Sequence, residues 1–110
     1  MDYLYKITVE IDDDEILRLQ QHDINSVYKT VREIFTKYDF TERSSTDDKI
    51  MIFTIGDEKD AFSDVGIVTN ALYDSWLGKY LKKMEWYDSS DNSTEDVLKE
   101  IRDFDNKYGK

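Results

Sequence analysis

The hydrophobic and polar positions of this chain repeat with two different periods, which divide it into predicted strands and helices. Residues 3–11 alternate and place one set of side chains on a single face: Tyr3, Tyr5, Ile7, Val9 and Ile11. This two-residue period predicts a first strand with one face in the core. From Ile24 to Tyr38 the apolar side chains recur at helical spacing, and Asp23 precedes them as a candidate N-cap. They predict a first helix.

The rest of the chain continues in the same manner. Residues 39–45 predict a short strand, residues 46–48 a hairpin turn, and residues 49–55 a strand that is apolar on both faces. A second helical stripe follows Gly56 and consists of Ala61, Val65, Val68, Leu72 and Trp76. Residues 83–88 predict a fourth strand, with Met84 and Trp86 on one face. Residues 93–96, Ser-Thr-Glu-Asp, resemble a capping box and predict the start of a terminal amphipathic helix.

This order, β-α-β-β-α-β followed by a helix, predicts the α+β class. A ferredoxin-like arrangement, with two helices on one face of a four-stranded antiparallel sheet, satisfies it with short connections. We expect one domain, in which residues 1–88 form the ferredoxin-like part and residues 89–110 a polar loop and the C-terminal amphipathic helix. The other face of the sheet then needs a cover, either the last helix or a second copy of the chain. A homodimer is therefore expected.

Composition excludes several classes of protein. With no cysteine among 110 residues, disulfides, thiolate zinc sites and cysteine nucleophiles are absent. The N-terminus does not resemble a signal peptide, and the longest apolar run, residues 50–53, is too short for a membrane span. We therefore expect a cytoplasmic protein with no membrane attachment.

Charge gives the main indication of a partner. The chain has 25 acidic and 15 basic residues and a net charge of −10. Tight binding to a nucleic acid backbone takes roughly 6 to 10 basic contacts, so direct binding of DNA or RNA is disfavoured. A protein partner with a basic or nucleic-acid-binding surface fits this charge, although acidity also serves solubility alone. Two acidic clusters are the candidate partner-binding residues: Glu10, Asp12, Asp13, Asp14 and Glu15, and Asp57, Glu58, Asp60 and Asp64.

The sequence contains few candidate catalytic residues. The single histidine, His22, precedes the predicted helix cap and is expected to be a surface residue. One histidine cannot form a zinc site, and without a cysteine the chain offers few partners for a catalytic triad. Calcium loop spacing is also missing. A Mg²⁺ or Mn²⁺ site using Glu10 and Asp12 is one alternative, and a solvated acidic turn without any cofactor is the other. An exposed aromatic patch beside lysines, suited to stacking on bases, is a further alternative and would consist of Tyr80, Trp86 and Tyr87. The other interpretation is that Trp86 belongs to the core.

Parts of the chain resemble the virulence-associated protein D family. The similar segments are residues 7–12 (Ile-Thr-Val-Glu-Ile-Asp), residues 26–28 opening a helix that ends at Phe40, and residues 76–77 leading into residues 83–88. Where the family has a Gln-Gly-Ser stretch, this chain has Arg43-Ser44-Ser45. The resemblance implies a ferredoxin-like dimer, related in fold to the small CRISPR adaptation nuclease, and a toxin-type endoribonuclease. It places Glu10 where the family has an acidic residue near the end of its first strand.

Three hypotheses follow. The first is a small acidic interaction protein that binds and inhibits or neutralises a partner, as immunity proteins, antitoxins and phage anti-defence proteins do. The second is a metal-dependent endoribonuclease of the resembling family, in which Glu10 and Asp12 act as catalytic residues or metal ligands. The third is a structural subunit whose task is dimerisation.

Overall fold

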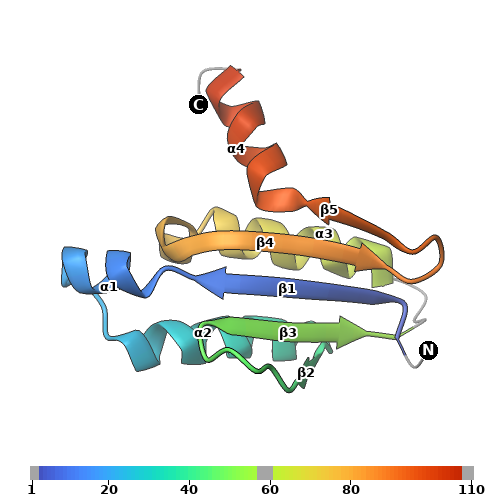
Figure 1. The fold of residues 1–110 in the computed structure, drawn as a ribbon, viewed down its shortest axis with the longest axis horizontal. Coiled ribbons are helices and arrows are strands. Elements are labelled where there is room, and N and C mark those ends of the chain that lie inside the picture. Colours follow the sequence, from blue (N-terminus) through green and yellow to red (C-terminus); the bar gives the residue numbers. More distant parts are fainter. Residues whose placement is uncertain (1–2, 57–60, 108–110) are drawn as a thin grey trace.

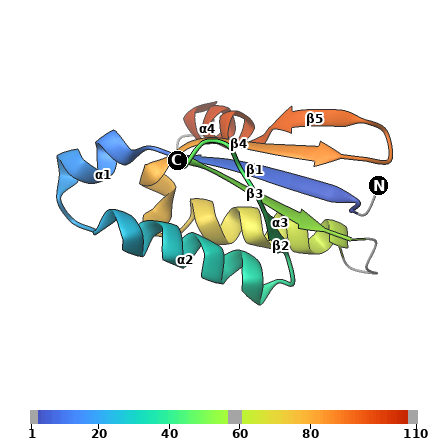
Figure 2. The ribbon, with the colours of Figure 1, turned by 60° about the horizontal axis from the view of Figure 1, so that its bottom comes forward.

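A five-stranded antiparallel sheet forms one layer of the fold in this computed structural model, which describes residues 3–56 and 61–107 (Figure 1). The strands are β1 (Tyr5–Ile11), β2 (Thr41–Arg43), β3 (Ile50–Ile55), β4 (Leu81–Asp88) and β5 (Ser93–Asp96), in the order β2-β3-β1-β4-β5. Helices α2 (Ile24–Lys37) and α3 (Ala61–Tyr73) form the second layer, on one face of the sheet (Figure 2). The predicted α+β class is confirmed.

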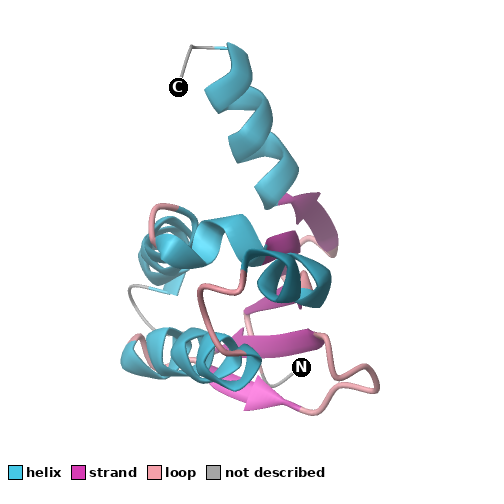
Figure 3. Cartoon of the chain, turned by 90° about the vertical axis from the view of Figure 1, so that its left-hand side faces the viewer, coloured by secondary structure: helices cyan, strands magenta, loops and turns pink. Residues whose placement is uncertain are grey.

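Three shorter or outlying elements complete the described part of the chain. Helix α1 (Asp13–Leu19) joins β1 to α2, and the 3₁₀ helix η1 (Trp76–Tyr80) joins α3 to β4. Helix α4 (Val97–Lys107) follows β5 and projects beyond that edge of the sheet (Figure 3). None of the helices within residues 3–56 and 61–107 has the length and apolar character needed to cross a membrane.

The core lies between the sheet and the two helices, on the predicted faces. Ile7 and Val9 of β1 are fully buried, and Phe53 of β3 is buried beside them. Phe35 of α2 stacks on Phe53, with 3.9 Å between the ring centroids and 4° between their planes. Alternation in β1 and helical spacing in α2 thus supply the two sides of one hydrophobic core.

The opposite face of the sheet carries polar and apolar side chains at its centre. Thr8 of β1 lies there between Ile52 of β3 and Glu85 of β4. Figure 1 looks onto this face, and none of the described helices crosses it, so α4 does not provide the expected cover. An antiparallel sheet commonly packs one face on the core and leaves the other in water. The homodimer expected to cover this face stays a prediction.

The acidic run after β1, for which the sequence predicted no helix, begins helix α1. Asp12 is the N-cap, because its Oδ1 accepts a hydrogen bond from the backbone N–H of Glu15 at 3.1 Å. The next three carboxylates lie in the first turn, where the helix dipole favours negative charge. Aspartate followed three residues later by glutamate is the spacing of a capping box, which was the overlooked signal.

The predicted helix start at residues 93–96 is wrong. These residues form β5, which pairs with β4 so that Thr94 lies opposite Tyr87 and Glu95 opposite Trp86. The cap of α4 is Asp96, three residues later than the Ser93 cap that the box implied, since Asp96 Oδ1 accepts from the backbone N–H of Lys99 at 3.1 Å. The apolar residues predicted to lie on one second helix are shared by two elements. Helix α3 ends at Tyr73, and Trp76 is the first residue of η1.

Candidate functional site

The N-terminal acidic cluster is spread over several surroundings. Glu10 lies on the outer face of the sheet, where its Oε2 is 3.8 Å from Lys82 Nζ. Asp12 belongs to the helix cap, and Asp14 is exposed in the first turn of α1. Glu10 and Asp12, the two residues of the metal-site alternative, therefore lie in different surroundings, one on a strand and one at a helix cap.

Two further members of this cluster are held by neighbouring side chains. Asp13 Oδ1 accepts a hydrogen bond from the hydroxyl of Tyr28 at 2.8 Å. Burial of Tyr28 and this hydrogen bond raise its pKa well above the ordinary tyrosine value. Glu15 pairs with Arg18 on the same helix. Much of the acidity of α1 therefore serves local structure.

The second predicted cluster is largely outside the described residues. Asp57, Glu58 and Asp60 all fall there. Asp64 lies in the first turn of α3 and is half-buried. The predicted partner-binding role of these residues stays a prediction.

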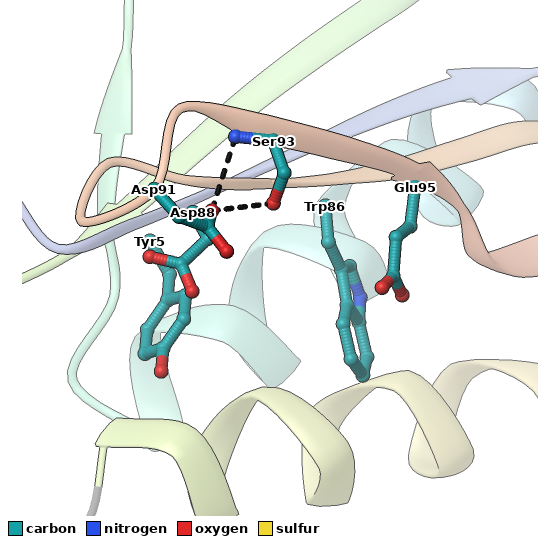
Figure 4. A pocket seen from close by; sticks show the side chains of 6 residues that line it. All are labelled: Tyr5, Trp86, Asp88, Asp91, Ser93 and Glu95. Carbon is teal, nitrogen blue, oxygen red and sulfur yellow. Dashed lines mark hydrogen bonds between the residues drawn. The ribbon is translucent and has the colours of Figure 1, made fainter.

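A third acidic group lines a pocket beside the β4–β5 hairpin (Figure 4). The pocket has a volume of about 200 Å³ and is lined by Tyr5, Trp86, Asp88, Asp91, Ser93 and Glu95. The sequence had predicted a polar loop at Asp91 and a helix cap at Ser93 and Glu95. The site combines aromatic rings with three carboxylates.

Strand register explains how the aromatic rings reach one pocket. Tyr5 lies opposite Asp88, and Trp86 lies opposite Ile7 on the same face of the sheet. In Figure 4 the rings of Tyr5 and Trp86 extend from the strands toward α3 on either side of the pocket. The indole is held in place because its Nε1 donates to Thr69 Oγ1 of α3 at 3.0 Å. The aromatic walls are therefore fixed by the sheet and by a helix.

The hairpin turn fixes two of the carboxylates. Asp88 Oδ1 accepts from the backbone N–H of Ser90 at 2.9 Å and from its hydroxyl at 2.7 Å. Asp91 Oδ1 accepts from the backbone N–H of Ser93 at 3.2 Å and also from its hydroxyl. Each carboxylate uses one oxygen in this way, and its Oδ2 has no donor among the described residues. Both side chains keep hydrogen-bonding capacity for another group.

The pocket has no cation of its own within the described part of the chain. None of Asp88, Asp91 and Glu95 lies in an ion pair there, whereas Glu10 and Glu15 both do. A guanidinium or ammonium group is attracted both by carboxylates and by aromatic ring faces. For metal binding, residues 3–56 and 61–107 contain no group of three or more histidine, cysteine or acidic side chains suitably placed. The pocket chemistry fits an organic cation.

His22 has surroundings that the sequence did not predict. Its ring stacks on Trp76, with centroids 4.1 Å apart, and its Nδ1 lies 2.8 Å from the hydroxyl of the buried Tyr80. It is half-buried rather than a simple surface residue. The alternative of a base-stacking patch is not met, because Tyr80 is buried, Trp86 packs against the core and Tyr87 lies on the opposite face of the sheet from Trp86.

No protein-family model, no curated protein and no solved structure matches this chain. The resemblance to the virulence-associated protein D family stays a prediction from the residues that carry it. Geometry and charge at the hairpin pocket are thus the observations from which a function is inferred.

Proposed function

We propose that this protein is a non-enzymatic interaction protein that binds and neutralises a protein partner through the partner's basic or nucleic-acid-binding surface. The hairpin pocket receives one arginine or lysine side chain of that partner. The observation that carries the proposal is the set of three carboxylates beside Trp86 that no lysine or arginine of the described chain neutralises.

The overall charge supports the same function. A net charge of −10 attracts a basic surface over a distance of about one Debye length, roughly 8–10 Å at physiological salt. This attraction raises the rate of association, while local contacts determine where the partner is held. A partner whose basic channel is covered by this protein loses access to its nucleic acid.

A triarginine peptide provides a direct probe. In a Trp76→Phe background Trp86 is the only tryptophan, so its fluorescence reports on the pocket. We expect the peptide to change this fluorescence. The triple variant Asp88→Asn, Asp91→Asn, Glu95→Gln should weaken its binding about five- to thirtyfold, because three partly exposed charge pairs contribute roughly 1–2 kcal/mol together. Asparagine keeps the Oδ1 acceptors of the turn, so the hairpin should persist.

A control triple changes net charge by the same amount elsewhere. Glu33→Gln, Asp39→Asn and Asp48→Asn alter exposed carboxylates that have no hydrogen bond or ion pair in the described chain and lie outside the acidic clusters predicted to bind a partner. We expect this control to weaken binding by less than about twofold. Equal losses in both triples would show that only the overall charge acts, and would contradict the pocket as the binding site.

For the fold, we propose the ferredoxin-like arrangement for the first four strands. Their spatial order β4-β1-β3-β2, with α2 following β1 and α3 following β3, supports it. Strand β5 then extends the sheet beside β4. The cytoplasmic location expected from the sequence remains a prediction.

The endoribonuclease is the second candidate. Glu10 is the penultimate residue of β1, which corresponds to the position that the resemblance implies for the acidic residue. Incubating labelled RNA with the protein and Mg²⁺ or Mn²⁺, beside Glu10→Gln, tests this alternative. Cleavage that disappears in the variant would favour the nuclease over the interaction protein. Sedimentation of the full chain tests the predicted homodimer and with it the structural-subunit hypothesis.

A further inference from the structure

Helix α4 presents an apolar surface that its own domain covers only in part. Its first turn is anchored, since Val97 and Leu98 are buried. Ile101 is half-buried, and Phe104 is 59% exposed. Figures 1 and 3 show this helix leaving the edge of the sheet, so its outer turns lie beyond the body of the fold. The apolar positions at 98, 101 and 104 continue one side of the helix from the core outward.

A groove of about 410 Å³ runs between α3 and α4. Helix α3 contributes Asn70 and Tyr73 to its lining, and Asp74 follows the end of α3. Helix α4 contributes Glu100, Ile101, Phe104 and Asp105. The hydroxyl of Tyr73 donates to Asp105 Oδ2 at 2.8 Å and so ties the two helices together. The two helices are therefore held together at the groove, and its mixed lining includes the apolar side chains of Ile101 and Phe104.

The charged groups in this lining are all acidic. They are Asp74, Glu100 and Asp105. Two cations of α4 are used elsewhere, because Arg102 donates to the carbonyl of Leu81 at 2.8 Å and Lys99 pairs with Asp103 at 3.2 Å. The groove thus combines apolar contact with negative charge at its border.

We propose that this groove binds a basic amphipathic helix of a partner protein. Apolar side chains one turn apart on that helix pack on Ile101 and Phe104, and flanking lysine or arginine side chains face the three carboxylates. A second copy of this chain is a poorer occupant, because it carries the same acidic groove and the same net charge of −10. The groove is a separate surface from the hairpin pocket and goes beyond the proposed function.

Fluorescence anisotropy with a labelled peptide tests the proposal on the full chain. The probe is a leucine–lysine peptide of about 14 residues with its leucines at helical spacing, which gives nearly four turns. A peptide of the same composition with scrambled order is its control. We expect the helical peptide to bind about tenfold more tightly than the scrambled one, and Phe104→Ser with Ile101→Ser to remove about tenfold of that affinity.

Leu17→Ser is the matched control on the protein, because Leu17 is another exposed apolar residue, 61% accessible on α1. It should leave binding within about twofold. If the double variant fails to fold, Phe104→Ser alone carries the test, since that side chain is mostly in solvent. Absence of binding, equal binding of both peptides, or unchanged affinity in the Phe104 variant would each overturn the proposal. The hairpin triple variant should bind the helical peptide as before and triarginine more weakly, so failure of one proposed surface is distinguishable from failure of the other.

Discussion

Replacing Thr69 by valine should loosen the wall of the hairpin pocket at a measurable cost. Thr69 is only 2% exposed, and its Oγ1 accepts the indole N–H of Trp86 at 3.0 Å while donating to the carbonyl of Val65 at 2.8 Å. Valine has nearly the same shape and removes both hydrogen bonds. The Val65 carbonyl retains its helical hydrogen bond, so the main loss is the partner of Trp86.

The size of the effect follows from the burial of the indole. An unsatisfied buried donor costs about 1–3 kcal/mol. Because Trp86 is half-buried, water relieves part of this penalty, and we expect Thr69→Val to lower the free energy of unfolding by about 1–2 kcal/mol. For a domain of this size that corresponds to a fall in melting temperature of roughly 4–8 °C for each kcal/mol.

Urea denaturation followed by far-ultraviolet circular dichroism measures this change without relying on tryptophan fluorescence. A double-mutant cycle with Trp86→Phe isolates the hydrogen bond, because phenylalanine keeps an aromatic wall without the N–H. The coupling between Trp86 and Thr69 should be about 0.5–1.5 kcal/mol. A coupling below about 0.3 kcal/mol would refute the reasoning, since valine would then act through packing alone.

Four further changes test other parts of the fold. Burial and the hydrogen bond to Asp13 raise the pKa of Tyr28, so the folded state keeps the phenol proton at a pH where the unfolded state loses it. The free energy of unfolding should therefore fall as pH rises above about 10. Alkaline denaturation curves should show a less steep fall in Tyr28→Phe. In thermal melts, Gly66→Ala should stabilise α3 by about 0.5–1 kcal/mol, since nothing lies within 4 Å of the added Cβ. Gly78→Ala should destabilise η1 by more than about 1 kcal/mol, because its Cβ would lie 2.3 Å from a backbone oxygen. Loss of the α1 cap in Asp12→Ala should cost about 1 kcal/mol in urea denaturation.

Local patterns were enough to predict the central elements of the fold. The alternation of β1 and the helical spacing of α2 each place a continuous apolar face, and both faces are buried as expected. Helix α1 was also within reach of the sequence, through the spacing of Asp12 and Glu15. It was missed because the run was treated as a set of candidate binding residues, and the effect of carboxylates on the free backbone amides of a helix start was not considered.

Strand β5 and the pocket beside it were beyond a local pattern. Ser-Thr-Glu-Asp is polar throughout, with the side-chain types of a helix start, and becomes a strand through its pairing with β4. Tyr5 joins Asp88 in the pocket through strand register, although the two are distant along the chain. Hydrophobic periodicity predicts which face of a helix or strand is buried. It does not predict which helices and strands pack against one another.

The carboxylates of this protein therefore divide by what each one contacts, and not by how densely they occur in the sequence. The run at residues 12–15 is the densest one described, yet three of its four carboxylates cap a helix, accept a tyrosine hydroxyl or pair with arginine. Asp88 and Asp91 are further apart in the sequence, and each keeps one oxygen without a donor among the described residues. Neutralising Asp12 or Asp13 should accordingly change the free energy of unfolding, whereas neutralising the hairpin carboxylates should change affinity for a cation at nearly constant stability. Measured side by side, these two responses separate acidity that stabilises the fold from acidity that is available to a partner.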